Sequence, residues 1–234
     1  MPALERIARA LFGGSCYLCR GRAQGLLCAA CDADLPCVGA ARCPRCALAS
    51  PGGALCGRCL VAPPAYDATV AALEYRFPAD VLVQQLKFAG ELALAPWAGE
   101  LLARAVERSA ASRVDCVLPV PLARPRLAAR GYNQAMEIAR AAARTLGLPL
   151  RPELCERVRT AAAQAELPLA ARAANVRGAF ACPRLVAGLE IAVVDDVMTS
   201  GATLGEIART LKAAGAARVV NWVFARTPPP AEAP

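Results

Sequence analysis

Residues 191–204, IAVVDDVMTSGATL, decide the fold that we expect for this chain. The first four are apolar, as in a parallel strand that is buried on both faces. Two adjacent acids follow, then a turn of small and hydroxyl residues with one glycine, then an amphipathic helix from about Thr203 to Ala214. The stretch therefore predicts a strand, a polar turn and a helix, which is the repeating pattern of α/β proteins.

The turn in this unit has the chemistry of a phosphate site. A helix N-terminus offers unpaired N–H groups and the positive end of the helix dipole to an anion, and Gly201 lets the backbone approach a ligand closely. We expect Asp195 and Asp196 at the carboxyl end of the strand, where they can accept hydrogen bonds from ribose hydroxyls or position Mg²⁺. An ordinary strand, acidic turn and capped helix is the alternative, but two consecutive acids after a buried strand are costly unless they are used.

The composition indicates a compact globular protein. Of the 234 residues, 56% are hydrophobic and 20% are charged, which excludes a disordered chain. No uninterrupted apolar run reaches about 18 residues, so we expect no membrane span. Residues 1–15 predict a short amphipathic helix and not a signal peptide, so we expect a cytoplasmic protein.

The charge is strongly positive and comes from arginine. The net charge is +8, and all but two of the 27 basic residues are arginines, the exceptions being Lys87 and Lys212. The planar guanidinium suits two-point contacts with phosphate, so a polyphosphate substrate and a nucleic acid both fit this charge. A GC-rich genome explains the excess of arginine equally well. The chain has no histidine, which excludes Ser-His-Asp and Cys-His catalysis and histidine as a zinc ligand.

Eight of the twelve cysteines form four C-x-x-C pairs, separated by 8, 11 and 9 residues. Two such pairs complete the four-thiolate shell of structural zinc, so we expect two zinc ions. Neighbouring pairs give the simplest partition, whereas interleaved pairs would form a cross-brace. A disulfide framework is the rival interpretation, but secreted frameworks rarely repeat C-x-x-C evenly, and no secretory signal is present. The expected ligands are Cys16, Cys19, Cys28 and Cys31 for one ion, and Cys43, Cys46, Cys56 and Cys59 for the other.

The remaining chain alternates predicted strands and helices, which indicates a mainly parallel sheet flanked by helices. Pro63-Pro64 ends the cysteine-rich region, and the residues after Thr227 are rich in proline. We expect a helix and double zinc ribbon over residues 1–62, an α/β domain over 63–227 and a disordered tail over 228–234. The predicted strands are 66–76, 114–118, 191–194 and 218–224, and the predicted helices are 80–88, 92–108, 133–146 and 203–214.

Two further segments carry polar chemistry. Residues 119–134, PVPLARPRLAARGYNQ, follow a strand and precede a helix, and their three arginines can hold an anion. A basic surface loop fits the same residues. Residues 157–180 are polar at intervals and weakly periodic, which fits either a mobile lid or an exposed loop that contains a helix.

Residues 191–204 resemble the phosphoribosyl pyrophosphate (PRPP) signature of type I phosphoribosyltransferases, which has two hydrophobic residues, two acids, a hydrophobic residue and a Thr/Ser-Gly-x-Thr loop. Nearly the whole chain resembles the ComF family, proteins tied to DNA uptake in competent bacteria and including the GntX-type homologues. In that family a double zinc ribbon precedes a type I phosphoribosyltransferase-like domain. Beside the cysteine pairs, the resemblance rests on QLKF at 85–88, PVP at 119–121, RGYNQ at 130–134 and VDD at 194–196. Family members often have Phe where this chain has Tyr132 and Thr where it has Ser200, and both changes keep the chemistry.

The resemblance implies PRPP and Mg²⁺ as ligands and assigns a role to each matching residue. Asp195 and Asp196 contact the ribose hydroxyls and, with Arg130, form the implied catalytic set. The turn wraps the 5′-phosphate, and Val120 to Ala123 lie at the pyrophosphate loop, with Arg126 or Arg130 as anion partner. The implied PRPP-binding set is Asp195, Asp196, Val197, Met198, Thr199, Ser200, Gly201, Ala202, Thr203, Val120, Pro121, Leu122, Arg126 and Lys87. The implied flexible hood includes Arg157, Thr160, Gln164, Arg172 and Asn175.

Two functional hypotheses follow. The first is an enzyme that transfers ribose 5-phosphate from PRPP to an unidentified nitrogen acceptor in a protein associated with DNA uptake. The second is a non-catalytic protein of the competence machinery whose zinc ribbons and arginines hold single-stranded DNA. Aromatic residues make up only 5% of the chain, which limits base stacking and favours the first hypothesis.

Overall fold

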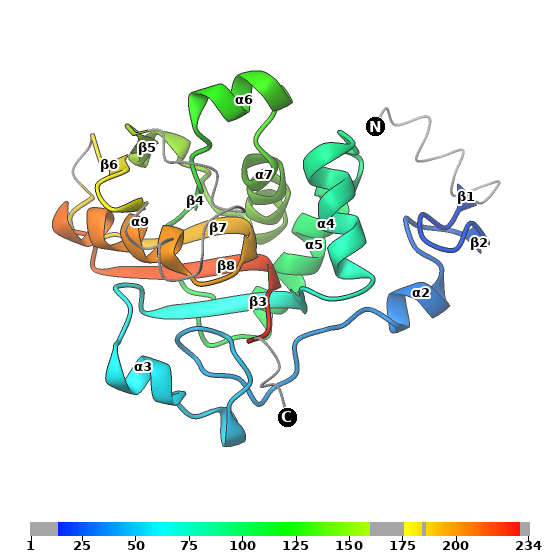
Figure 1. Ribbon diagram of the computed structural model, residues 1–234, viewed down its shortest axis with the longest axis horizontal. Coiled ribbons are helices and arrows are strands. Elements are labelled where there is room, and N and C mark those ends of the chain that lie inside the picture. The colour runs from blue at the N-terminus through cyan, green and yellow to red at the C-terminus, as the bar shows by residue number, and fades with distance from the viewer. Residues whose placement is uncertain (1–13, 160–175, 184–185, 230–234) are drawn as a thin grey trace.

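The computed structural model describes residues 14–159, 176–183 and 186–229, which surround a four-stranded sheet (Figure 1). The strand order is β3-β8-β7-β4, and all three pairings are parallel. The mainly parallel sheet expected from the sequence is therefore confirmed. The strands are β3 (Ala68–Glu74), β4 (Cys116–Pro119), β7 (Glu190–Met198) and β8 (Arg218–Arg226).

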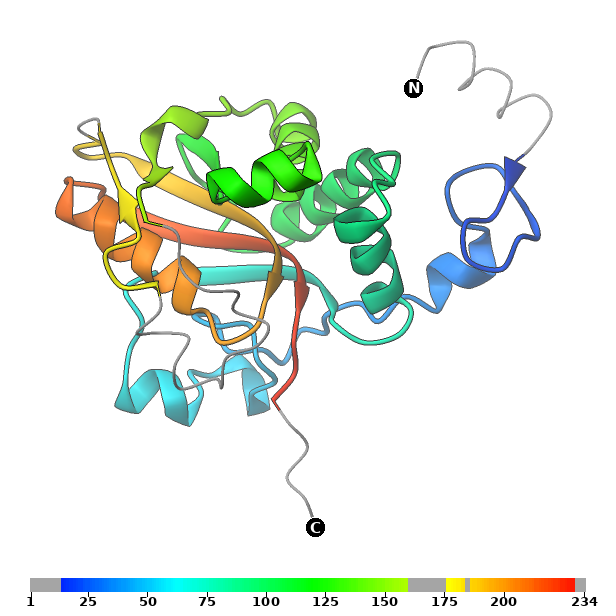
Figure 2. The same ribbon diagram turned by 45° about the horizontal axis from the view of Figure 1, so that its top comes forward.

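Helices cover both faces of the sheet (Figures 1 and 2). Helices α5 and α7 pack on one face, and α9 packs on the other. Helix α4 extends from the edge at which the parallel strands end and packs against α5. The helix bounds are α4 (Ala79–Phe88), α5 (Leu94–Glu107), α7 (Gln134–Leu146) and α9 (Ala202–Ala213).

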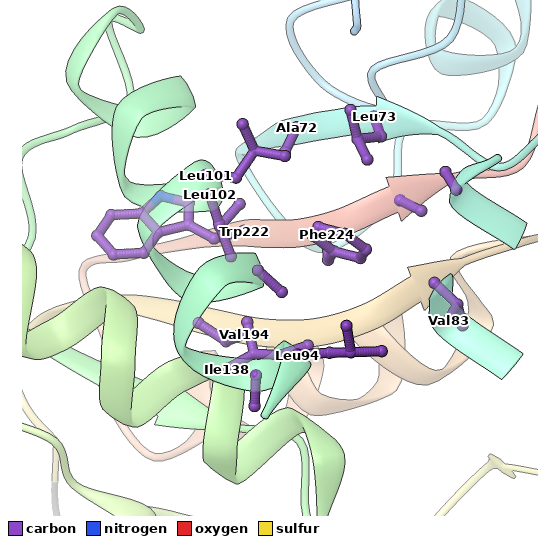
Figure 3. Packing of buried hydrophobic residues seen from close by; sticks show 14 of the residues in the cluster. Ala72, Leu73, Val83, Leu94, Leu101, Leu102, Ile138, Val194, Trp222 and Phe224 are labelled. Atoms are coloured by element: carbon purple, nitrogen blue, oxygen red, sulfur yellow. The ribbon is translucent and has the colours of Figure 1, made fainter. Parts of the chain in front are cut away.

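Strand β7 is apolar on both sides because each side meets a different helical layer. Val194 belongs to the core that contains Leu102, Ile138 and Trp222, and Figure 3 shows these side chains converging between α5, α7 and the sheet. Its neighbour Val193 points to the opposite core, which includes side chains of α9. A continuous apolar run was therefore the correct signal for a central parallel strand.

The basic segment over residues 119–134 contains a helix, α6 (Arg124–Arg130). Pro125 lies in its first turn, and Gly131 ends it in the left-handed conformation with φ 80°. Neither interpretation of this segment included a helix, although these two residues are start and stop signals of a short one. Asn133 is not the first residue of the next helix but its cap, and its side chain accepts a hydrogen bond from the Ala135 amide at 3.1 Å.

The cysteine-rich part consists of two small units with similar local structure. The first contains β1 (Gly14–Ser15), β2 (Arg22–Ala23) and α2 (Ala29–Ala33), and the second contains the short 3₁₀ helix η1 (Pro51–Gly53) and α3 (Gly57–Val61). The remaining elements are η2 (Pro152–Leu154) and an antiparallel pair formed by β5 (Glu156–Arg157) and β6 (Phe180–Ala181). The helix expected within residues 1–15 lies almost entirely outside the described residues. Across the described ranges, no helix has both the length and the apolarity to cross a membrane.

Candidate functional site

The two adjacent acids lie within β7, just beyond the end of the neighbouring strand β4. Pro119 of β4 pairs with Val194, and the Val120 amide donates to the Val194 carbonyl at 2.9 Å. Strand β7 then continues beside β8 as far as Met198. We expected the strand to end before the acids, but it includes them in its last part. The shorter β4 leaves one side of β7 open at this point.

The carboxyl groups of the two acids have different surroundings. Asp196 Oδ2 lies 3.1 Å from Lys87 Nζ of α4, and the Asp196 side chain is only 4% exposed. This oxygen accepts no hydrogen bond from any described residue, so the contact with Lys87 is an ion pair without a directed hydrogen bond. Burial, together with the charge of Asp196, raises the pKa of Asp195 to about 8. The two adjacent carboxyl groups therefore resist carrying two negative charges at once.

The turn after β7 depends on glycine for its shape. Gly201 precedes α9 in the left-handed conformation with φ 81°. A Cβ atom at this position would lie 2.7 Å from Met198 Cε and 2.9 Å from Tyr66 Oη. The glycine is therefore required by packing beneath the turn as well as by its backbone conformation. Ser200 Oγ accepts a hydrogen bond from the Ala202 amide at 3.3 Å, which orders the start of the helix.

A cavity of about 790 Å³ opens beside the acidic pair and has the size of a small-molecule site. A smaller hollow of about 60 Å³ lies against the turn. All of the PRPP-binding residues implied by the sequence line one or both spaces. The large cavity is lined by Lys87, Val120, Pro121, Leu122, Arg126, Arg130, Asp195, Asp196, Val197, Thr199 and Thr203, and Met198, Ser200, Gly201 and Ala202 line the hollow.

Helix α6 and the end of α4 also line the cavity. Arg126 and Arg130 of α6 both line the cavity. The Arg130 guanidinium lies 5.5 Å from the centre of the Phe88 ring, and its Nη1 donates to Gln134 at 2.5 Å. Tyr132 donates a hydrogen bond to the Leu86 carbonyl, which ties the α6–α7 connection to α4. Both basic groups, Lys87 and Arg130, are thereby held on fixed helices.

Of the implied hood residues, the structure places Arg157. It lies in β5, lines the large cavity and has its guanidinium 5.4 Å from the centre of the Phe180 ring. Thr160, Gln164, Arg172 and Asn175 lie outside the described residues. A hood over the cavity therefore remains a prediction.

Four cavity residues had no role assigned from the sequence, namely Tyr75, Phe88, Ala129 and Gln134. Tyr75 directly follows β3, at the edge where the parallel strands end, and this position was a usable signal. Phe88 and Gln134 stand within the QLKF and RGYNQ motifs. Ala129 had no signal, because its place in the cavity depends on the unexpected helix α6.

The eight paired cysteines form two clusters that fit tetrahedral zinc. All twelve cysteines are free thiols, and within each cluster the four sulfurs lie within 4.8 Å of one another. Sulfurs of different pairs approach at 3.7 Å between Cys19 and Cys28, and at 3.6 Å between Cys46 and Cys56. A zinc ion with bonds of about 2.3 Å requires sulfur separations of about 3.8 Å. The partition by neighbouring pairs is confirmed, with Cys16, Cys19, Cys28 and Cys31 in one cluster and Cys43, Cys46, Cys56 and Cys59 in the other.

The two clusters repeat the same local structure. Arg20 and Ala47, each one residue after a C-x-x-C pair, have positive φ values of 64° and 58°. Their amides donate to the carbonyls of Cys16 and Cys43, which closes the turn around the sulfurs. Burial alone would raise the pKa of Cys16 and of Cys43. Hydrogen bonds from backbone groups outweigh this effect and lower each pKa to about 6. One thiol of each cluster is thus suited to bind metal as a thiolate.

Known proteins are similar to both parts of the chain. Residues 7–60 match the double zinc ribbon domain. DNA utilization protein YhgH of Salmonella typhimurium is 35% identical over 222 residues, which cover 92% of this chain and 97% of that protein. Competence protein F of Haemophilus influenzae is 31% identical over 172 residues, 70% of this chain and 74% of that protein. The chain belongs to the ComF family.

Two solved structures are similar to part of this ComF-family chain. One is UMP synthase of Leishmania donovani, with 18% identity, a TM-score of 0.35 and coverage of 59% of this chain. The other is an allosteric regulatory enzyme of purine biosynthesis, with 25% identity, a TM-score of 0.34 and coverage of 54% of this chain. The matched region spans only 23% and 25% of those chains, respectively, so neither identifies an activity.

Proposed function

We propose that this ComF-family protein binds PRPP with Mg²⁺ and transfers its ribose 5-phosphate to a nitrogen acceptor. One observation carries this proposal: a single cavity gathers an acidic pair, a hydroxyl-rich turn at a helix N-terminus and two arginines of α6. These groups match three parts of the substrate, namely the ribose hydroxyls, the 5′-phosphate and the pyrophosphate.

Each group has a role that follows from its chemistry. The first turn of α9 presents backbone N–H groups and hydroxyls to the 5′-phosphate. Asp195 and Asp196 accept hydrogen bonds from the ribose hydroxyls, and the buried Asp196 Oδ2 has capacity for one. Arg126 or Arg130, with the loop from Val120 to Leu122, holds the pyrophosphate. Bound Mg²⁺ would neutralise phosphate charge, and carboxylate oxygens are ligands that it accepts.

The proposed reaction needs no protein nucleophile. The acceptor nitrogen attacks ribose C1, the bond from C1 to the pyrophosphate oxygen breaks, and the acceptor loses a proton. Positive charge develops on the ribose ring as pyrophosphate leaves, so the protein contributes by holding the leaving group and excluding water. The proposed hood, formed by residues 157–177, would close the cavity during this step.

A role in DNA use is proposed from the relatives. They are named for DNA utilization and for competence, and this chain carries a net charge of +8. We infer that the protein acts in DNA uptake, in a reducing compartment such as the cytoplasm where thiolates can hold zinc. The alternative is a non-catalytic protein that holds single-stranded DNA, for which affinity should fall steeply with salt concentration.

The division into residues 1–62, 63–227 and 228–234 is likewise a proposal. The second zinc ribbon packs closely on the α/β domain, since Cys43, Cys46 and Cys59 share a core with β7 and α9. The boundary at residue 62 would therefore mark a change of composition and not a flexible linker.

A crystal of the protein soaked with PRPP and Mg²⁺ tests the proposed function. We expect ligand density in the large cavity, with the ribose beside Asp195 and Asp196 and the 5′-phosphate at the turn before α9. Density for PRPP elsewhere, or none at saturating concentration with an open cavity, would contradict the proposal. Release of pyrophosphate in the presence of candidate nitrogen acceptors then separates an enzyme from a binding protein.

A further inference from the structure

Arg226, the last residue of β8, joins the second cysteine cluster to the turn before α9. Its side chain is buried, with 3% exposure. Nε donates to the Cys46 carbonyl at 2.8 Å, and Nη1 donates to the carbonyls of Met198 at 2.9 Å and Thr199 at 2.6 Å. One guanidinium therefore holds a zinc-binding pair and the start of the turn in a fixed relative position.

The charge of Arg226 makes this link sensitive to the metal. A buried cation is costly unless acceptors and a counter-charge surround it. Within the ranges that the structure describes, no carboxylate forms an ion pair with Arg226, and its partners are backbone carbonyls. A zinc ion with four thiolates carries a net charge of −2, and Cys46 is one of those thiolates. A filled zinc site would therefore supply a compensating charge beside the guanidinium.

Tyr66 also lies between the second cysteine cluster and the turn before α9. It is 3% exposed, and its hydroxyl oxygen lies 2.9 Å from where a Cβ atom on Gly201 would stand. A cavity of about 700 Å³ is lined jointly by Cys46 and Cys59 of the cluster, by Tyr66 and Arg226, and by residues 200–202 of the turn. The turn thus has the ligand cavity on one side and the second zinc unit on the other.

The first cysteine cluster has no comparable link. Its unit shares a core with α4, to which Cys16 and Leu27 belong, and the Tyr17 hydroxyl lies 3.5 Å from Gln85 Oε1 on the same helix. None of the hydrogen bonds among described residues connects this unit to residues 198–203. Loss of zinc from this cluster should therefore leave the turn unchanged.

We propose that Arg226 is a positioning residue that makes the order of the 198–203 turn depend on zinc in the second cluster. Zinc there fixes the Cys46 carbonyl, Arg226 transmits that position to the Met198 and Thr199 carbonyls, and the turn is held ready for a phosphorylated ligand. The identity of that ligand rests on the proposed function, whereas the coupling between zinc and the turn does not.

Hydrogen exchange measured by mass spectrometry on the full chain tests this coupling without a ligand. Arg226→Lys keeps the charge but cannot reach all the carbonyls, and Arg218→Lys is the matched control because Arg218 pairs with Glu190 at the opposite end of β8. We expect amides of residues 199–204 to exchange at least about fivefold faster in Arg226→Lys and to be unchanged in Arg218→Lys. A chelator should remove zinc from the second cluster about tenfold faster in Arg226→Lys.

Cys16→Ser provides a second route should Arg226→Lys fail to fold, because this variant keeps only the second zinc. Chelation of that zinc should release the turn, whereas loss of the first zinc alone should not. Unchanged exchange at residues 199–204 after either perturbation would overturn the inference. Failure of the wild-type protein to bind PRPP would refute the proposed function but would leave the exchange result standing, so the two failures are distinguishable.

Discussion

Replacing Lys87 by methionine should reveal the cost of holding two carboxyl groups side by side in the cavity wall. Lys87 Nζ lies 3.1 Å from Asp196 Oδ2, and the two side chains are 23% and 4% exposed. Removal of the cation leaves a buried carboxylate without a partner, next to a second acid. Breaking a buried ion pair costs about 3–5 kcal/mol, and the partial exposure of Lys87 lowers that cost, so we expect the free energy of unfolding to fall by about 2 kcal/mol at pH 8.

Urea unfolding of the wild type, Lys87→Met, Asp196→Asn and the double variant isolates the pair energy. Arg218→Met is the control, since Arg218 and Glu190 form a more exposed pair, with side chains 30% and 41% exposed. Its loss should cost less than about 1 kcal/mol. A Lys87–Asp196 coupling below about 0.5 kcal/mol at pH 8 would refute the description of this contact as a buried ion pair.

Three other predictions concern the metal, the acids and the turn. Metal analysis of protein purified without chelator should find about two zinc ions per chain, and one ion or none would contradict the two four-cysteine sites. Because burial raises the pKa of Asp195 to about 8, the folded state disfavours the carboxylate that the unfolded chain forms above about pH 4, so the free energy of unfolding should fall as the pH rises from 5 to 8. Asp195→Asn should remove this slope, and an unchanged slope would show that another group causes it. Gly201→Val should abolish PRPP binding measured by calorimetry while weak binding of single-stranded DNA survives, because the new Cβ meets Met198 and Tyr66 beneath the turn. Intact PRPP binding in the folded variant would mean that the turn does not hold the 5′-phosphate.

The sequence predicted the central strands and the long helices because their signals are local. The apolar run before Asp195 and the helical periodicity after Thr203 depend only on neighbouring residues. The four C-x-x-C pairs predicted both cysteine clusters for the same reason, since spacing alone brings two sulfurs together. Helix α6 was missed because it is short and basic, although Pro125 and Gly131 marked its ends.

Contacts between distant segments could not be predicted. The resemblance grouped Lys87 with the acids, but the 3.1 Å contact with Asp196 depends on how α4 packs beside the sheet. Arg226 had no sequence signal at all, because its bond to the Cys46 carbonyl joins residues 180 positions apart. For this reason the sequence predicted the cysteine-rich part as a separate domain. In the structure, its second half shares a buried core with β7 and α9.

Calorimetric titration of PRPP with Mg²⁺ into the Asp195→Asn, Asp196→Asn double variant tests the central claim most directly. The matched control is Glu100→Gln with Glu107→Gln, which likewise replaces two carboxyl groups by amides, at two exposed positions of α5. Two ribose-directed acceptors become poorer ones in the first variant, so its affinity should fall at least about tenfold, near 1.4 kcal/mol, while the control binds like the wild type. Unchanged affinity in the folded double variant would place the ligand away from the acidic pair and contradict the account.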